Sequence, residues 1–153
     1  MKKQLDLDFL ENHKVLKYLQ EKGVRHTSII ESPENVKNPY LNQGSHPDIV
    51  ERVWDKLGKN LPLDCKQLVY GTPCLLNPIN GIIFVICNGT QYNLQLTRKD
   101  FLIAKKYVLK TTTKWSNGKI MDSVEQLGEN WIFGGWKDLE KEWVENYFNE
   151  SNQ

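Results

Sequence analysis

The pattern of apolar and polar positions is most regular between Gln67 and Thr97. There, three apolar runs rich in β-formers are separated by two turn-like segments, Pro78-Ile79-Asn80-Gly81 and Asn88-Gly89. An Asn-Gly pair between apolar runs favours a tight hairpin, because both central residues of a type I′ turn need positive φ. The pattern therefore predicts an antiparallel β-meander over about residues 66–96.

A two-residue turn at Asn88-Gly89 would pair Cys87 with Thr90 and place every second residue on the same face of the sheet. The run from Ile82 to Cys87 is apolar at every position. A strand of this kind is covered on both of its faces, so the run is expected to be a central strand with strictly alternating faces.

The next run, Thr90 to Leu96, is apolar on one face only. Its other face carries three amides, Gln91, Asn93 and Gln95. Such a row either meets water or lines a polar groove, and contact with water is the commoner arrangement. We therefore expect this face to be solvated.

Apolar residues also recur at helical spacing on both sides of the meander. Ser45 is expected to cap the second helix, with Pro47 and Asp48 in its first turn. Helices before and after a run of strands predict a single α+β domain over residues 1–153, with the helices packed on one face of the sheet. The expected helices span about 8–22, 45–57, 97–108, 120–127 and 137–149. In the third of them, Thr97 is expected to be the cap and Leu102 to face inward.

Between the first two helices, residues 31–44 contain two prolines, three asparagines and few apolar side chains. This composition predicts a long surface loop, and such loops often carry functional residues. Tyr40 lies within this loop and His46 follows it, so both are candidate ligand-binding residues.

The tryptophans are the other candidates for a binding surface. Trp54, Trp131 and Trp143 fall on apolar stripes and are expected to be core residues. Trp136, after two glycines, and Trp115, in a turn-like stretch, are the most suitable to be exposed. With Tyr40 and His46 they form the predicted ligand site, in which rings would stack on a ligand and nearby amides would bond to it.

Charge and hydropathy narrow the classes of partner. The 20 basic and 19 acidic residues give a net charge of +1, which argues against nucleic acid as a partner. No apolar run is long enough to cross a membrane, and no secretory signal is recognisable, so we expect a cytoplasmic protein with no membrane association.

Catalytic and metal-binding patterns are weak. Cys65, Cys74 and Cys87 show no CxxC spacing and are expected to be buried, and the sequence calls for no cofactor or metal. The preferred hypothesis is a non-catalytic binding or adaptor domain for an unknown protein or small-molecule ligand. One alternative is a small hydrolase using His46 and Asp48 with a neighbouring Cys or Tyr. The other is an immunity-like, partner-regulating protein, which a contiguous surface patch would favour.

Overall fold

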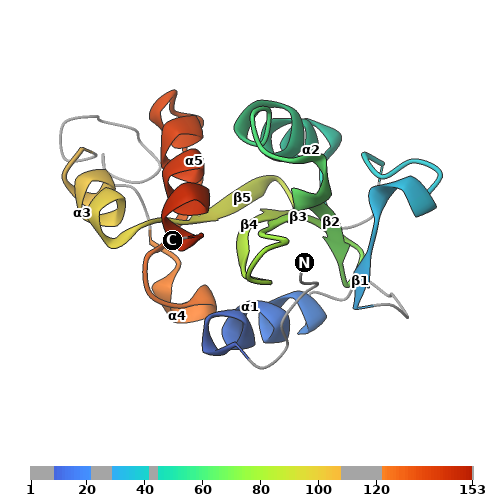
Figure 1. The fold of residues 1–153 in the computed structure, drawn as a ribbon, viewed down its shortest axis with the longest axis horizontal. Coiled ribbons are helices and arrows are strands. Elements are labelled where there is room, and N and C mark those ends of the chain that lie inside the picture. Colours follow the sequence, from blue (N-terminus) through green and yellow to red (C-terminus); the bar gives the residue numbers. More distant parts are fainter. Residues whose placement is uncertain (1–8, 22–28, 42–44, 108–121, 153) are drawn as a thin grey trace.

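A computed structural model of the chain describes residues 9–21, 29–41, 45–107 and 122–152. Six strands form one antiparallel sheet whose spatial order follows the chain (Figure 1). The predicted α+β meander is confirmed, and one short strand extends it at each edge. The strands are β1 (Ile30–Glu31), β2 (Lys66–Val69), β3 (Thr72–Leu76), β4 (Ile83–Asn88), β5 (Gln91–Gln95) and β6 (Trp131–Phe133).

The helices lie before the meander, within it and after it. Helix α2 continues directly into the π-helical turns of η2, so the two form one rod. The helices are α1 (Leu10–Glu21), α2 (Pro47–Glu51), η2 (Arg52–Leu57), α3 (Arg98–Tyr107), α4 (Val124–Leu127) and α5 (Leu139–Ser151), with 3₁₀ turns η1 (Pro33–Asn35) and η3 (Leu63–Cys65). Among the described helices none is long and apolar enough to cross a bilayer.

Helices cover both faces of the sheet, so the prediction that they pack on one face is wrong. Figure 1 shows α2 and α5 on one side of the strands and α1 and α4 on the other. The reason lies in β3 and β4, where every residue but Asn88 is buried. Strands that are apolar on both sides need a cover on both sides.

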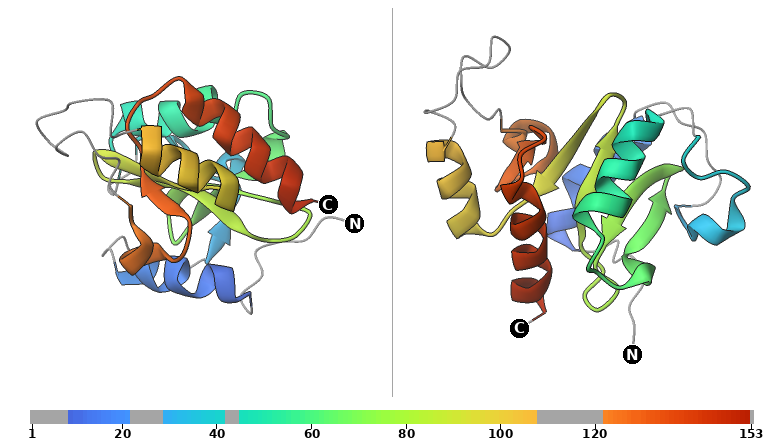
Figure 2. Two further views of the ribbon diagram at one scale, coloured as in Figure 1. Left: turned by 90° about the vertical axis from the view of Figure 1, so that its left-hand side faces the viewer. Right: turned by 90° about the horizontal axis from the view of Figure 1, so that it is seen from above.

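Each face has its own core. The α2/α5 side is built around Trp54, Phe84 and Trp143, and the α1/α4 side around Leu19 and Trp131. In Figure 2, α3 lies beside α5, and a hydrogen bond of 3.0 Å from Asn146 Nδ2 to Asp100 Oδ2 joins the two helices.

The β4–β5 hairpin turns one residue later than predicted. Cys87 pairs with Tyr92 instead of Thr90, and the two turn residues are Gly89 and Thr90. Gly89 has a φ of 66°, and positive φ at the first central residue alone is the pattern of a type II′ turn. Asn88 stays in the strand, where its Nδ2 donates to the hydroxyl of Tyr18 on α1 at 2.7 Å.

A β-bulge in β4 interrupts the expected alternation. Leu75 pairs with Val85 but Leu76 pairs with Ile83, so Phe84 is an extra residue on β4. As a result, Phe84 and Val85 both join the α2/α5 core, while Ile83 joins the α1/α4 core.

Helix α2 begins one residue later than expected. Its N-cap is His46, whose Nδ1 accepts a hydrogen bond of 3.1 Å from Asp48 N. The predicted cap, Ser45, is buried and forms an isolated parallel bridge with Gly89 of the hairpin turn. Ser45 therefore contacts the hairpin turn and does not cap α2.

Two further helix predictions have opposite outcomes. Thr97 caps α3 as expected, since its Oγ1 accepts from Asp100 N at 3.0 Å. Leu102, expected to face inward, is 46% exposed, because the inner side of α3 is filled by Phe101 and Ala104.

The predicted surface loop at 31–44 is partly ordered by the core. Glu31 belongs to β1, η1 follows, and Val36 and Tyr40 pack against the α2/α5 core. Residues 42–44 and 108–121 lie outside the described part of the chain, and the second range includes the start of the helix expected at 120–127.

Replacing Phe84 by Ala is expected to lower the free energy of unfolding by about 3–5 kcal/mol, because the ring is buried in the bulge. It stacks on Tyr147 with ring centroids 5.5 Å apart. The matched control is Ile79→Ala in the adjoining loop, where the side chain is 52% exposed. That change should stay within about 0.5 kcal/mol in chemical denaturation, and equal losses for both variants would contradict the placement of Phe84.

Candidate functional site

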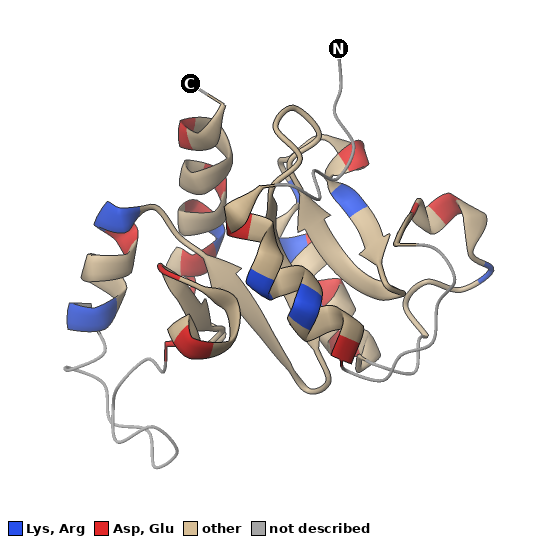
Figure 3. Cartoon of the chain, turned by 90° about the horizontal axis from the view of Figure 1, so that it is seen from below, with Lys and Arg blue, Asp and Glu red and all other residues tan. Residues whose placement is uncertain are grey.

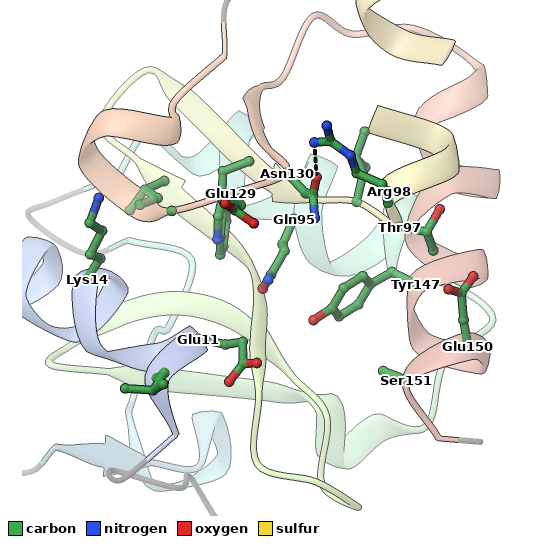
Figure 4. A pocket seen from close by; sticks show the side chains of 15 residues that line it. Glu11, Lys14, Gln95, Thr97, Arg98, Glu129, Asn130, Tyr147, Glu150 and Ser151 are labelled. Atoms are coloured by element: carbon green, nitrogen blue, oxygen red, sulfur yellow. Dashed lines mark hydrogen bonds between the residues drawn. The ribbon is translucent and has the colours of Figure 1, made fainter. Parts of the chain in front are cut away.

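A pocket of about 480 Å³ opens beside the end of β5, between α1 and α5 (Figure 4). Four parts of the chain line it: α1, the β5–α3 junction, the segment from α4 to β6, and the last turns of α5. Its apolar lining consists of Leu10, Leu96, Leu127 and Trp131. Because the lining comes from both faces of the sheet, the pocket depends on the two-sided packing of the helices.

Gln95 is the central polar residue of this pocket. Its side chain is 7% exposed, and the carboxamide points into the hollow (Figure 4). Gln95 Oε1 has no hydrogen-bond partner among the described residues. Most buried polar atoms in proteins have a partner, so this oxygen is a candidate acceptor for a ligand.

The expectation that the amide row of β5 is solvated is wrong. Asn93 and Gln95 are both buried, because α1 and α4 cover this face of the sheet. Gln95 instead lines a pocket, which corresponds to the second possibility, a polar groove.

Two more polar groups line the pocket together with Gln95. Figure 4 shows the phenol of Tyr147, from α5, and the carboxylate of Glu11, from α1, directed into the same space. Burial, helped by the negative charges of Glu11 and Glu150, raises the pKa of Tyr147 above its ordinary value. The phenol therefore keeps its proton at neutral pH and can donate or accept a hydrogen bond.

The neighbouring residue, Asn12, fixes the position of Glu11. The buried side chain of Asn12 donates to Gly81 O at 2.8 Å and accepts from Ile83 N at 3.0 Å. These two bonds attach α1 to the start of β4. The first turn of α1 is thus held against the sheet at the pocket.

Gly128 shapes the opposite wall. Its φ is 120° and its ψ is −179°, a conformation open almost only to glycine. The chain then turns through Asn130, whose carbonyl accepts from Leu96 N at 2.9 Å. This bond joins the start of β6 to the end of β5 and completes this wall of the pocket.

The basic residues at the rim are engaged by other protein groups. Arg98 Nη1 donates to Asn130 Oδ1 at 3.1 Å, and its guanidinium lies 5.6 Å from the ring centroid of Phe101. Lys14 Nζ reaches Glu125 O at 3.5 Å. Figure 4 shows neither cation directed at the centre of the pocket.

The predicted site residues lie elsewhere. Tyr40 is half-buried, donates to Asp55 Oδ1 at 2.9 Å, and packs edge-on against Trp54. Burial together with Asp55 raises the pKa of Tyr40 to about 12. His46 is exposed at the start of α2, so both residues have structural roles here and their part in ligand binding stays a prediction.

Trp136 is 54% exposed, as the sequence predicted. The Arg52 guanidinium lies 5.4 Å from the centroid of its ring, and its φ of 58° is unusual for a bulky residue. The lining of the pocket includes Trp131 but not Tyr40, His46 or Trp136. Trp115 lies outside the described residues.

A second polar cluster is buried beside Trp136. Arg52 Nη2 is 2.8 Å from Glu140 Oε1 and also donates to Lys137 O at 2.9 Å. The hydroxyl of Tyr92 donates to Glu140 and accepts from Trp136 N at 2.7 Å. Burial alone would lower the pKa of Arg52, but its bonds to Glu140 and Tyr92 outweigh burial and raise it.

This cluster is saturated with internal bonds, so we assign it a structural role. The second carboxylate oxygen of Glu140 accepts from Gly135 N at 2.7 Å. A Cβ at Gly134 would lie 2.0 Å from the Tyr92 ring, which is why the chain here needs glycine. Sequence reasoning missed Glu140, although it lies on the same helical stripe as Trp143 and Val144 and could have been noticed there.

Two groups of the hydrolase alternative, His46 and Asp48, are neighbours on the exposed start of α2. His46 Nδ1 lies 3.8 Å from Asp48 Oδ2, with the two side chains 54% and 80% exposed. All three cysteines are buried, and burial together with Asp64 raises the pKa of Cys65 to about 12. A thiol in that state is not a nucleophile at neutral pH. Within the described ranges, no group of three His, Cys, Asp or Glu side chains is placed to hold a metal ion.

Comparison with models of protein families, with curated proteins and with solved structures finds no match to this chain.

Replacing Glu140 by Gln is expected to lower the free energy of unfolding by about 3–5 kcal/mol, because Arg52 would be left as an uncompensated buried charge. The Glu140 side chain is 1% exposed and that of Arg52 is 14% exposed. Chemical denaturation would measure the loss, with Glu142→Gln on the exposed side of α5 as the control, expected within about 0.5 kcal/mol. Similar, small effects of both changes would show that the cluster contributes little.

Proposed function

We propose that this protein is a non-catalytic domain that binds a small polar molecule in the pocket between α1 and α5. The observation that carries the proposal is Gln95, a buried carboxamide that points into a pocket of about 480 Å³ with its Oε1 unpaired among the described residues. An unpaired buried acceptor destabilises the fold by about 1–3 kcal/mol. A ligand that donates to it would recover that free energy.

The composition of the pocket supports a ligand of this kind. Small-molecule sites are concave, about 300–1,000 Å³ in volume, and combine apolar walls with a few placed polar groups. Here Leu96, Leu127 and Trp131 supply apolar surface, and Gln95, Tyr147 and Glu11 supply the polar groups.

The other hypotheses have less support. The aromatic site predicted around Tyr40, His46, Trp115 and Trp136 retains one suitable residue, the exposed Trp136. An immunity-like role would need a contiguous acidic or apolar surface, whereas acidic and basic residues are mixed along the helices in the view of Figure 3. The same mixture argues against nucleic acid as a partner. We also propose that the protein acts in the cytoplasm, because three buried cysteines without CxxC spacing suit a reducing compartment.

The test is a screen by nuclear magnetic resonance with isotope-labelled protein and fragments that carry amines, acids, amides or alcohols. Bound fragments are expected to shift the side-chain amide signals of Gln95 and the indole N–H signal of Trp131. Binding should be lost in Gln95→Leu and kept in Trp136→Ala. The reverse result would favour the aromatic site, and a screen without any shift at the pocket would overturn the proposal.

Gln95→Leu should also raise the stability of the ligand-free protein by about 1 kcal/mol, because an apolar side chain of similar size removes the unpaired acceptor. Thermal or chemical denaturation of the two proteins would measure this gain. Gln91→Leu, on the same strand but at a half-buried position, is the control and should change stability by about 0.5 kcal/mol or less. A marked loss of stability in Gln95→Leu would mean that Gln95 serves the fold.

A further inference from the structure

The charges around the pocket are unbalanced. Three carboxylates line it, from Glu11, Glu129 and Glu150, and none of them forms an ion pair within the described part of the chain. The two cations of the lining, Lys14 and Arg98, are bonded to a backbone carbonyl and to Asn130. Both partners are neutral, so the two cations keep their charge, and the lining carries three negative charges against two positive ones.

The groups at the centre of the pocket need a hydrogen-bond donor. Gln95 Oε1 is an acceptor with no partner among the described residues. The Glu11 carboxylate, which points to the same space (Figure 4), can only accept when ionised. Two acceptors, one of them charged, are complementary to a cationic donor.

We propose that the ligand is a small organic ammonium ion whose nitrogen donates to Gln95 Oε1 and to the Glu11 carboxylate. Its hydrocarbon part would lie against Leu96 and Trp131. This inference rests on the proposed function, since it names the chemical class of the molecule bound in the same pocket.

Other classes of ligand fit less well. An anion would need Arg98 or Lys14, and Figure 4 shows neither of them directed at the centre of the pocket. A neutral alcohol has one donor hydrogen and could satisfy only one of the two acceptors, whereas an ammonium ion has three. Charge-assisted hydrogen bonds are also about twice as strong as neutral ones.

The experiment compares three probes of the same shape: benzylamine, which is protonated at neutral pH, benzyl alcohol and benzoate. Each is titrated into labelled protein while the Gln95 side-chain amide and Trp131 indole signals are followed. Benzylamine is expected to give saturable shifts at both, with the alcohol and the acid binding about tenfold more weakly or worse.

Variants assign the contacts. Glu11→Gln should weaken benzylamine binding about tenfold or more while leaving benzyl alcohol little changed, because only the charged donor loses its counter-ion. Gln95→Leu should abolish the benzylamine shift at Trp131. Glu142→Gln removes the same charge from an exposed part of α5 that does not line the pocket, so it should leave binding unchanged.

The results separate the two proposals. Benzoate or benzyl alcohol binding at Gln95 as tightly as benzylamine would overturn the ammonium assignment and leave the pocket as a ligand site. Equal weakening by Glu11→Gln and Glu142→Gln would overturn the contact with Glu11. If none of the three probes shifts the Gln95 signals, the ammonium assignment fails, and the wider fragment screen alone decides the function of the pocket.

Discussion

The buried ion pair between Arg52 and Glu140 holds the two halves of the α2/α5 layer together. Arg52 belongs to η2 and Glu140 to α5, and Tyr92 joins both of them to β5. Removing two charges from water is costly, and a pair of this kind is stable only when further hydrogen bonds satisfy its remaining atoms. Here the backbone at Gly135 and Lys137 supplies those bonds, so the segment between β6 and α5 is fixed as well.

The pocket is a consequence of that constraint. The ion pair sets the position of α5, and two turns further along the same helix Tyr147 reaches the pocket. Helix α1, on the opposite face, brings Glu11 to the same place, and Gln95 lies between them at the end of β5. Helices on a single face would have left the amides of β5 in water. The two-sided cover turns one of them into a candidate binding group.

The features that the sequence predicted correctly are those decided by neighbouring residues: the meander, the central position of β4, and Thr97 as a cap. The errors arise where distant segments meet. The hairpin shifts because Asn88 is bound by Tyr18 of α1. Likewise, the amide row of β5 is patterned as a solvated face, and only the placement of α1 and α4 buries it. Tyr40 and His46 stand out in the sequence as polar or aromatic residues near a loop, yet their side chains serve packing and capping.

An unpaired buried polar atom does not by itself mark a binding site. Ser45, Thr72 and Ser123 each have such a hydroxyl oxygen among the described residues, and none of the three lines the pocket. Gln95 differs because its carboxamide faces an open volume that also receives a carboxylate and a phenol from two other elements. A flexible side chain in a close-packed core has no room to find a partner, whereas one that faces a pocket can be satisfied by whatever enters it. The feature that supports a binding function is therefore an unpaired acceptor on a side chain that lines a pocket.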